Sequence, residues 1–178
     1  GTTNPAKGPF WAWEVLMPGV PFDASPESPQ FPRVQAIVLM TDGQSHGGNG
    51  DAYHGWFGAG DQSASASSFG SMQLLVYNTD CSTTTKTVNN NLGNRLLALA
   101  TKIKGCDATK GPGWGPIKLY VIQYQSPSES GATALTTLLS SVATDKNPPY
   151  FFQAKDGDEL QAAFTAIGAS LSALRLVQ

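Results

Sequence analysis

Two oxygen-bearing residues stand where this chain could hold a divalent metal ion, Thr3 near its start and Asp42 after an apolar run. The run Val34–Thr41 is typical of a strand buried on both faces of a mostly parallel sheet, and such sheets bind ligands at the carboxyl ends of their strands. A hydroxyl and a carboxylate suit Mg²⁺, Mn²⁺ or Ca²⁺. Two ligands are too few to hold such an ion unaided, and Asp42 could equally cap the turn that follows it.

A second candidate is a hydrolytic serine, because Gly43–Gly47 fits the pattern G-x-S-x-G directly after the predicted strand. A nucleophile elbow leads into a helix, whereas Gly47–Gly50 is a poor helix former. The histidines of the chain are His46 and His54, so Ser45 has none far downstream to complete a triad. We therefore interpret these residues as a polar loop and predict that the chain is not an enzyme. The alternative is an esterase-like hydrolase that uses Ser45.

The segment from about 44 to 90 is rich in Gly, Ser, Asn and Thr, and we interpret it as a long insertion. A stretch of this length without clear elements is uncommon inside a compact domain. Within it, Met72–Tyr77 could form a short strand or helix. Tyr53, Trp56 and Phe57 could form an aromatic recognition loop, or they could cover the edge of the core.

Predicted helices and strands alternate along the rest of the chain. Apolar residues at helical spacing indicate helices, and unbroken apolar runs indicate strands. The expected elements are a helix from Asn4-Pro5 to about Met17, the strand 34–41, a helix over 90–104, a strand over 117–124, a helix over 132–143, a strand over 150–154 and a final helix. Asp156 and Glu159 form a capping-box pattern before that last helix. The alternation predicts one α/β domain over residues 1–178, with an open, mostly parallel sheet and flanking helices.

The composition favours an exported protein. Charged residues make up 13% of the 178 residues and the net charge is −2, so nucleic-acid binding has no electrostatic basis. No apolar run approaches the roughly 20 residues of a membrane span. Cys81 and Cys106 are too far apart for a CxxC motif. Their polar, loop-like surroundings favour a disulfide over two unrelated buried thiols.

Taken together, these residues resemble a von Willebrand factor A domain, and more narrowly the C-terminal half of pilus-assembly proteins of the TadG (tight-adherence) type. The ordered match consists of Gly1–Asn4 with Gly8–Trp13 and Leu16–Pro18, then Ile37–Gly43, Leu119–Tyr124, and Tyr150–Ala154 with the final helix to Leu176. The resemblance implies a von Willebrand A or Rossmann-like sheet. It covers residues 1–43 and about 90–178.

The same resemblance implies a metal-ion-dependent adhesion site, in which Thr3 supplies a hydroxyl and Asp42 a carboxylate. The family's Asp-x-Ser-x-Ser motif and first strands are not in this chain. We therefore expect Mg²⁺ or Ca²⁺ only if that segment is supplied by a preceding part of the protein or by a second chain. The family's cysteine pair is replaced here by Ala100 and Val142, and Cys81–Cys106 would take its place.

We thus expect a binding or assembly protein of the bacterial cell envelope, related to Tad-type pilus assembly or adhesion. Its partner would be a pilus or envelope protein, with no nucleic acid and no membrane span in this chain. It would work in the periplasm, in the envelope or outside the cell. A purely structural envelope protein with a vestigial metal site is a further alternative.

Overall fold

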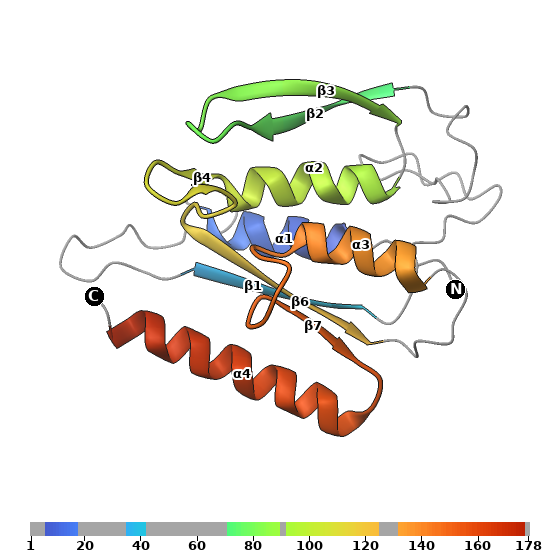
Figure 1. Cartoon of the computed structure of the whole chain (residues 1–178), viewed down its shortest axis with the longest axis vertical. Helices are drawn as coiled ribbons and strands as arrows, with labels where there is room; N and C mark the ends of the chain where they lie inside the picture. Colours follow the sequence, from blue (N-terminus) through green and yellow to red (C-terminus); the bar gives the residue numbers. More distant parts are fainter. Residues whose placement is uncertain (1–5, 18–34, 42–70, 90–91, 125–131, 177–178) are drawn as a thin grey trace.

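The centre of the fold is a parallel sheet. The computed structural model describes residues 6–17, 35–41, 71–89, 92–124 and 132–176. Within these ranges the sheet has the order β1–β6–β7, and both strand pairs are parallel (Figure 1); the strands are β1 (Gln35–Thr41), β6 (Ile117–Tyr124) and β7 (Phe151–Ala154). The predicted α/β architecture with a mostly parallel sheet is confirmed at this level, and its von Willebrand A or Rossmann identity stays a prediction.

Helices cover the two faces of the sheet unequally. In Figure 1, α1 (Lys7–Leu16), α2 (Leu92–Lys104) and α3 (Ala132–Val142) lie on one side of the strands, and α4 (Gly157–Leu176) lies on the other. No helix within the described ranges is long and apolar enough to cross a bilayer.

The side chains of β6 explain why both faces attract helices. Successive residues of a strand point to opposite faces. Leu119 and Val121 therefore enter the core under α1, α2 and α3, whereas Tyr120 and Ile122 enter the core under α4. All four side chains are buried because the strand is covered from both sides, and its central residues Leu119–Ile122 are therefore apolar on both faces.

A β-hairpin forms an additional layer over α2. Strands β2 (Ser71–Tyr77) and β3 (Thr83–Asn89) pair in antiparallel register, and β2 contacts α2 (Figure 1). The segment interpreted as a long insertion therefore contains a hairpin over residues 71–89, and Met72–Tyr77, expected as a short strand or helix, is part of a strand. Asn78–Ser82 form the hairpin turn, and residues 44–70 and 90 lie outside the described residues.

The strand β3 was not predicted because its residues are mostly polar. Its sequence TTTKTVN contains one apolar side chain and no alternation. β-branched threonine nevertheless fits an extended, solvent-exposed strand, and here the pairing with β2 supplies the backbone partners.

The starts of the helices α1 and α4 differ little from expectation. The predicted start at Asn4-Pro5 lies outside the described residues, and the helix α1 begins at Lys7. At the start of α4, the Asp156 carboxylate accepts a hydrogen bond from the Glu159 N–H at 2.9 Å. The Glu159 carboxylate accepts one from the Lys155 N–H at 3.0 Å. The capping box is thus present, with its return bond one residue earlier than in the standard motif.

Candidate functional site

The predicted metal residues cannot be placed, since Thr3 and Asp42 both lie outside the described residues. The same holds for Ser45, His46 and His54, and for the aromatic residues Tyr53, Trp56 and Phe57. Asp42 is the next residue in the chain after Thr41, which ends β1. Among the described residues, no group of three or more His, Cys, Asp or Glu side chains could hold a metal ion.

Neutral polar side chains gather near the carboxyl ends of the strands. Gln123 of β6 is buried, and its Oε1 accepts hydrogen bonds from Thr136 Oγ1 at 2.9 Å and Gln153 Nε2 at 3.5 Å. Gln153 Nε2 also donates to Thr136 Oγ1 at 3.0 Å. Thr41, likewise buried, is the register partner of Gln123. This polar cluster joins β6, β7 and α3 at the edge where α/β sheets bind ligands.

The polar cluster does not by itself fit a hard cation. Mg²⁺ and Ca²⁺ sites use carboxylates as well as neutral oxygens. The oxygens of Gln123 and Thr136 instead accept hydrogen bonds from within the cluster. The metal expectation therefore still depends on Thr3 and Asp42 and stays a prediction.

At the opposite, amino end of the strands, lysine and aromatic side chains stabilise a loop. Lys118 Nζ donates to the carbonyls of Trp114, at 3.0 Å, and of Gly115. It also lies 5.4 Å from the centre of the Trp114 ring, whose edge meets Tyr150. Burial lowers the pKa of Lys118, and the nearby Lys110 ammonium lowers it further. Because the Lys118 ammonium has carbonyl partners in its own loop, we interpret this cluster as structural.

Lys104 likewise binds backbone carbonyls, at the C-terminal end of α3. Its Nζ donates to the carbonyls of Ser141 at 2.9 Å and Ala143 at 2.8 Å. A cation at this position satisfies the free carbonyls at a helix C-terminus. Burial lowers the pKa of Lys104 to about 8.

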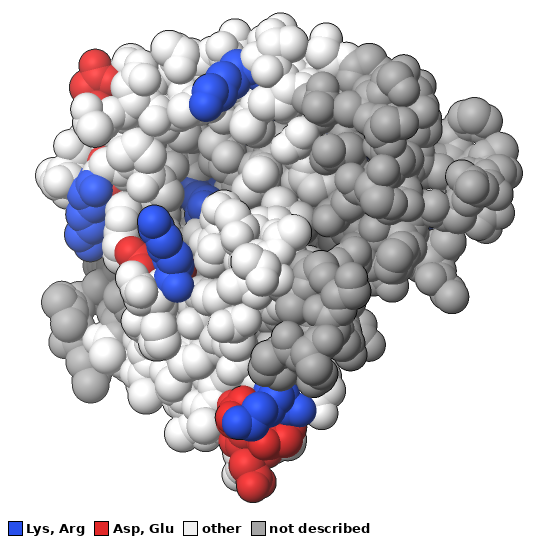
Figure 2. Space-filling model, turned by 45° about the vertical axis from the view of Figure 1, so that its right-hand side comes forward, with Lys and Arg blue, Asp and Glu red and all other residues white. Residues whose placement is uncertain are grey.

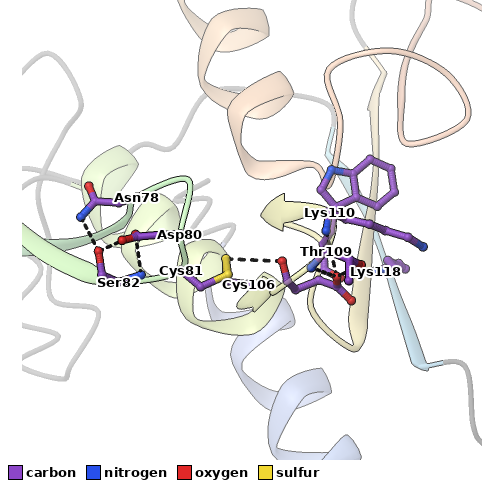
Figure 3. The surroundings of a disulfide bond; sticks show 10 residues. Asn78, Asp80, Cys81, Ser82, Cys106, Thr109, Lys110 and Lys118 are labelled. Atoms are coloured by element: carbon purple, nitrogen blue, oxygen red, sulfur yellow. Dashed lines mark hydrogen bonds between the residues drawn. A yellow bond between two sulfur atoms is a disulfide. The ribbon is translucent and has the colours of Figure 1, made fainter.

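The predicted disulfide is confirmed, and it ties the outer hairpin to the rest of the fold. Figure 3 shows the bond between Cys81, in the β2–β3 turn, and Cys106, in the short strand β4 (Cys106–Asp107). β4 pairs with β5 (Gly111–Pro112). The turn around Cys81 is held by Asp80, whose carboxylate accepts hydrogen bonds from the Ser82 N–H at 3.0 Å and hydroxyl at 2.6 Å.

Asp107 fixes the second anchor of the disulfide. Its carboxylate accepts hydrogen bonds from the backbone N–H and hydroxyl of Thr109 and from the N–H of Lys110. These bonds to the ionised form lower the pKa of Asp107 to about 2. Both ends of the bridge are therefore locally ordered by an aspartate.

The largest unexpected feature is the exposure of β1 on the side of α4. Val38 and Met40 are 42% and 52% exposed, whereas their register partners Tyr120 and Ile122 in β6 are fully buried. The helix α4 contacts β6 and β7, and on this face of β1 only Ala36 packs against the core under α4, whereas Val38 and Met40 stay about half exposed. The prediction that the strand 34–41 is buried on both faces is therefore wrong.

Apolar side chains are also exposed on α1, the helix that contacts β1. Phe10, Trp13 and Leu16 of this helix pack against the core. Trp11 and Val15, one turn apart, are 57% and 47% exposed. We use the term open flank for the face of β1 that carries Val38 and Met40, and Trp11 and Val15 are not part of it. No pattern within β1 distinguishes it from a buried strand, so the sequence gives no signal for this surface.

Comparison with known proteins gives no match to any protein-family model, any curated protein or any solved structure. The functional argument therefore rests on the geometry and on the residues themselves.

Proposed function

We propose that this chain is an exported binding and assembly protein of the bacterial cell envelope that docks another polypeptide along the open flank. The observation that carries this proposal is the exposure of Val38 and Met40 beside fully buried neighbours. Large apolar side chains exposed at the edge of an otherwise covered sheet are typical of a surface that binds a protein.

The chemistry of the surface favours a neutral, apolar contact. The strand β1 carries no charged residue. Among the described residues on the face shown in Figure 2, the charged side chains form a few separate groups between uncharged residues. Recognition by steering between opposite charges is therefore disfavoured, and burial of apolar area would provide most of the binding free energy.

Two further features support export and assembly. The Cys81–Cys106 disulfide is typical of an oxidising compartment, such as the bacterial periplasm or the cell surface. The sequence resemblance to the C-terminal half of TadG-type proteins favours a role in Tad-type pilus assembly or adhesion. Both features are compatible with a protein whose partners are other envelope components.

Photo-crosslinking in the source cells tests this function. A photoreactive phenylalanine analogue would replace Val38 in one variant and the exposed α4 residue Ala162 in a matched control. We expect protein adducts of defined mass at position 38 and none at position 162, with adduct formation reduced when Met40→Lys is added. Mass spectrometry of the adduct would identify the partner.

The proposal would be contradicted by equal adduct yields at the two positions, or by no adduct at position 38 in a folded protein. Thermal unfolding of each purified variant shows whether it is folded. An unchanged midpoint for the position 38 variant would establish that a missing adduct reflects missing contact.

A further inference from the structure

We propose that the Cys81–Cys106 disulfide is a redox-sensitive latch, which holds the hairpin β2–β3 on α2 when it is oxidised and releases the hairpin when it is reduced. On release the hairpin leaves α2 and exposes the apolar side chains of β2, while the parallel sheet and its helices stay folded. The hairpin lies over α2, on the opposite side of the sheet from α4 (Figure 1), so the latch is separate from the open flank. Its operation does not depend on the docking proposed there.

The first observation is that the disulfide closes a ring that contains β3 and α2. Strand β3 runs from the hairpin turn to Asn89, and α2 begins at Leu92. The helix ends at Lys104, two residues before Cys106. The disulfide therefore joins the hairpin turn to the segment that follows the end of α2 (Figure 3). Reduction opens this ring and removes the covalent attachment of the turn.

The second observation is that the hairpin is packed weakly. None of residues 71–88 is buried. Among the described residues, both apolar cores and the side chains packed against them come from other elements. The strand β2 contacts α2, and its apolar and aromatic side chains are partly buried: Met72, Leu74, Leu75, Val76 and Tyr77. A two-stranded hairpin alone is marginally stable in water, so the disulfide provides a large share of its attachment.

The third observation is the backbone conformation of Cys81, whose φ is 62°. This left-handed region is unfavourable for a residue with a side chain such as that of cysteine. The Cys81 N–H donates to the Asn78 carbonyl at 3.0 Å, which helps to hold the turn in this conformation. Residues in such conformations persist where their surroundings hold them, and they occur often in switch segments. Reduction removes one of these constraints and lets the turn relax.

The chemistry of release is thiol–disulfide exchange with a dithiol reductant of the thioredoxin class. Cys81 and Cys106 are both partly exposed, so a thiolate can reach the bond. That thiolate attacks one sulfur and forms a mixed disulfide, which the second thiol of the reductant then resolves. Two electrons and two protons pass from the dithiol to the cysteine pair, and the reductant becomes a disulfide. The reverse exchange, with an oxidised dithiol protein, closes the latch.

Hydrogen exchange of the whole chain in both redox states tests the latch, with dithiothreitol as the dithiol. In the reduced protein the amides of β2 and β3 should exchange faster by roughly tenfold or more, because the covalent attachment of the turn is lost. The amides of β6 should keep their rates. Re-oxidation with oxidised glutathione should restore slow exchange in the hairpin. A dye that binds apolar surface should fluoresce more strongly with the reduced protein.

The matched control is the double variant Cys81→Ser with Cys106→Ser. Without reductant it should exchange as the reduced wild type does, and dithiothreitol should leave its exchange unchanged. A response of this variant to dithiothreitol would show that the reductant acts elsewhere and would overturn the latch.

Two further outcomes would also overturn it. Equal exchange of β2 and β3 in the two redox states would mean that the hairpin stays on α2 without the bond. Equal acceleration in β6 would mean that reduction unfolds the whole domain. Neither result bears on photo-crosslinking at position 38, which tests the open flank separately.

Discussion

The strands β1 and β6 are neighbours with similar apolar sequences but different surroundings. Tyr120 and Ile122 of β6 are fully buried beneath α4, whereas Val38 and Met40, their partners in register, remain about half exposed. The difference arises because α4 packs against β6 and β7, and the strand sequences do not account for it. An apolar run therefore shows that a strand can be buried, and the packing of the other elements decides whether it is.

The largest expected effect on stability comes from shortening side chains that lie on the same face of the two strands. Ile122→Ala should lower the free energy of unfolding by about 4 kcal/mol, because it removes apolar contacts and leaves a cavity. Met40→Ala should cost less than about 1 kcal/mol, since its side chain is half exposed. Urea unfolding measures both. Similar losses for the two variants would mean that β1 is covered as well as β6.

Removing the disulfide should destabilise the part of the fold that carries the hairpin β2–β3 and leave the open flank unchanged. The bridge closes a loop of 25 residues, so Cys81→Ala with Cys106→Ala should cost on the order of 3 kcal/mol. Hydrogen exchange should accelerate most in β2 and β3. Cross-linking at position 38 should persist, and its loss would show that the hairpin and the flank are coupled.

Raising the pH should stabilise the protein through Lys104. Its pKa is about 8 in the folded state and 10.5 in an unperturbed lysine, so between these values the unfolded state binds more protons. The free energy of unfolding should therefore increase as the pH rises from 8 towards 10.5, by at most about 3 kcal/mol.

The matched variant for this prediction is Lys104→Met, which keeps a long side chain without the amine. Subtracting its pH profile from that of the wild type removes the contribution of other titrating groups. A difference that is flat over this range, or that falls with pH, would contradict a lowered pKa. Val38→Lys should show the wild-type slope.

A smaller effect is expected where Thr144 closes the loop after α3. Its Oγ1 accepts a hydrogen bond from the Leu119 N–H at 2.9 Å, and its own N–H donates to the Leu119 carbonyl at 2.9 Å. Thr144→Val keeps the shape and leaves a buried N–H of β6 without its acceptor, at a cost of about 2 kcal/mol. Urea unfolding measures this loss, and Thr144→Ser should restore most of it.

Much of the framework could be predicted from the sequence, because local patterns determine it. The run Ile117–Tyr124 is apolar on both faces, and the final helix carries an apolar stripe after a capping pattern. The disulfide was predictable because the chain has two cysteines in polar surroundings. The Thr-rich strand β3 was not, because its conformation depends on a partner strand.

The candidate surfaces could not be predicted because they form between distant parts of the chain. Gln123, Thr136 and Gln153 come from two strands and a helix, and no spacing in the sequence relates them. The exposure of Met40 depends on where α4 lies, more than a hundred residues later. Thr3 and Asp42 lie outside the described residues, so the metal site stays a prediction from the sequence.

The Cys81–Cys106 bond also determines how the protein would respond to a pulling force. When a domain unfolds under a force applied to its ends, it lengthens by about 3.3–3.6 Å for each residue released. The bond closes off 25 residue steps, which include β3 and α2. Under oxidising conditions we therefore expect roughly 80 Å of contour length to stay withheld when the rest of the chain extends. The force would pass through the disulfide and leave β3 and α2 unloaded, which limits how far the chain can stretch.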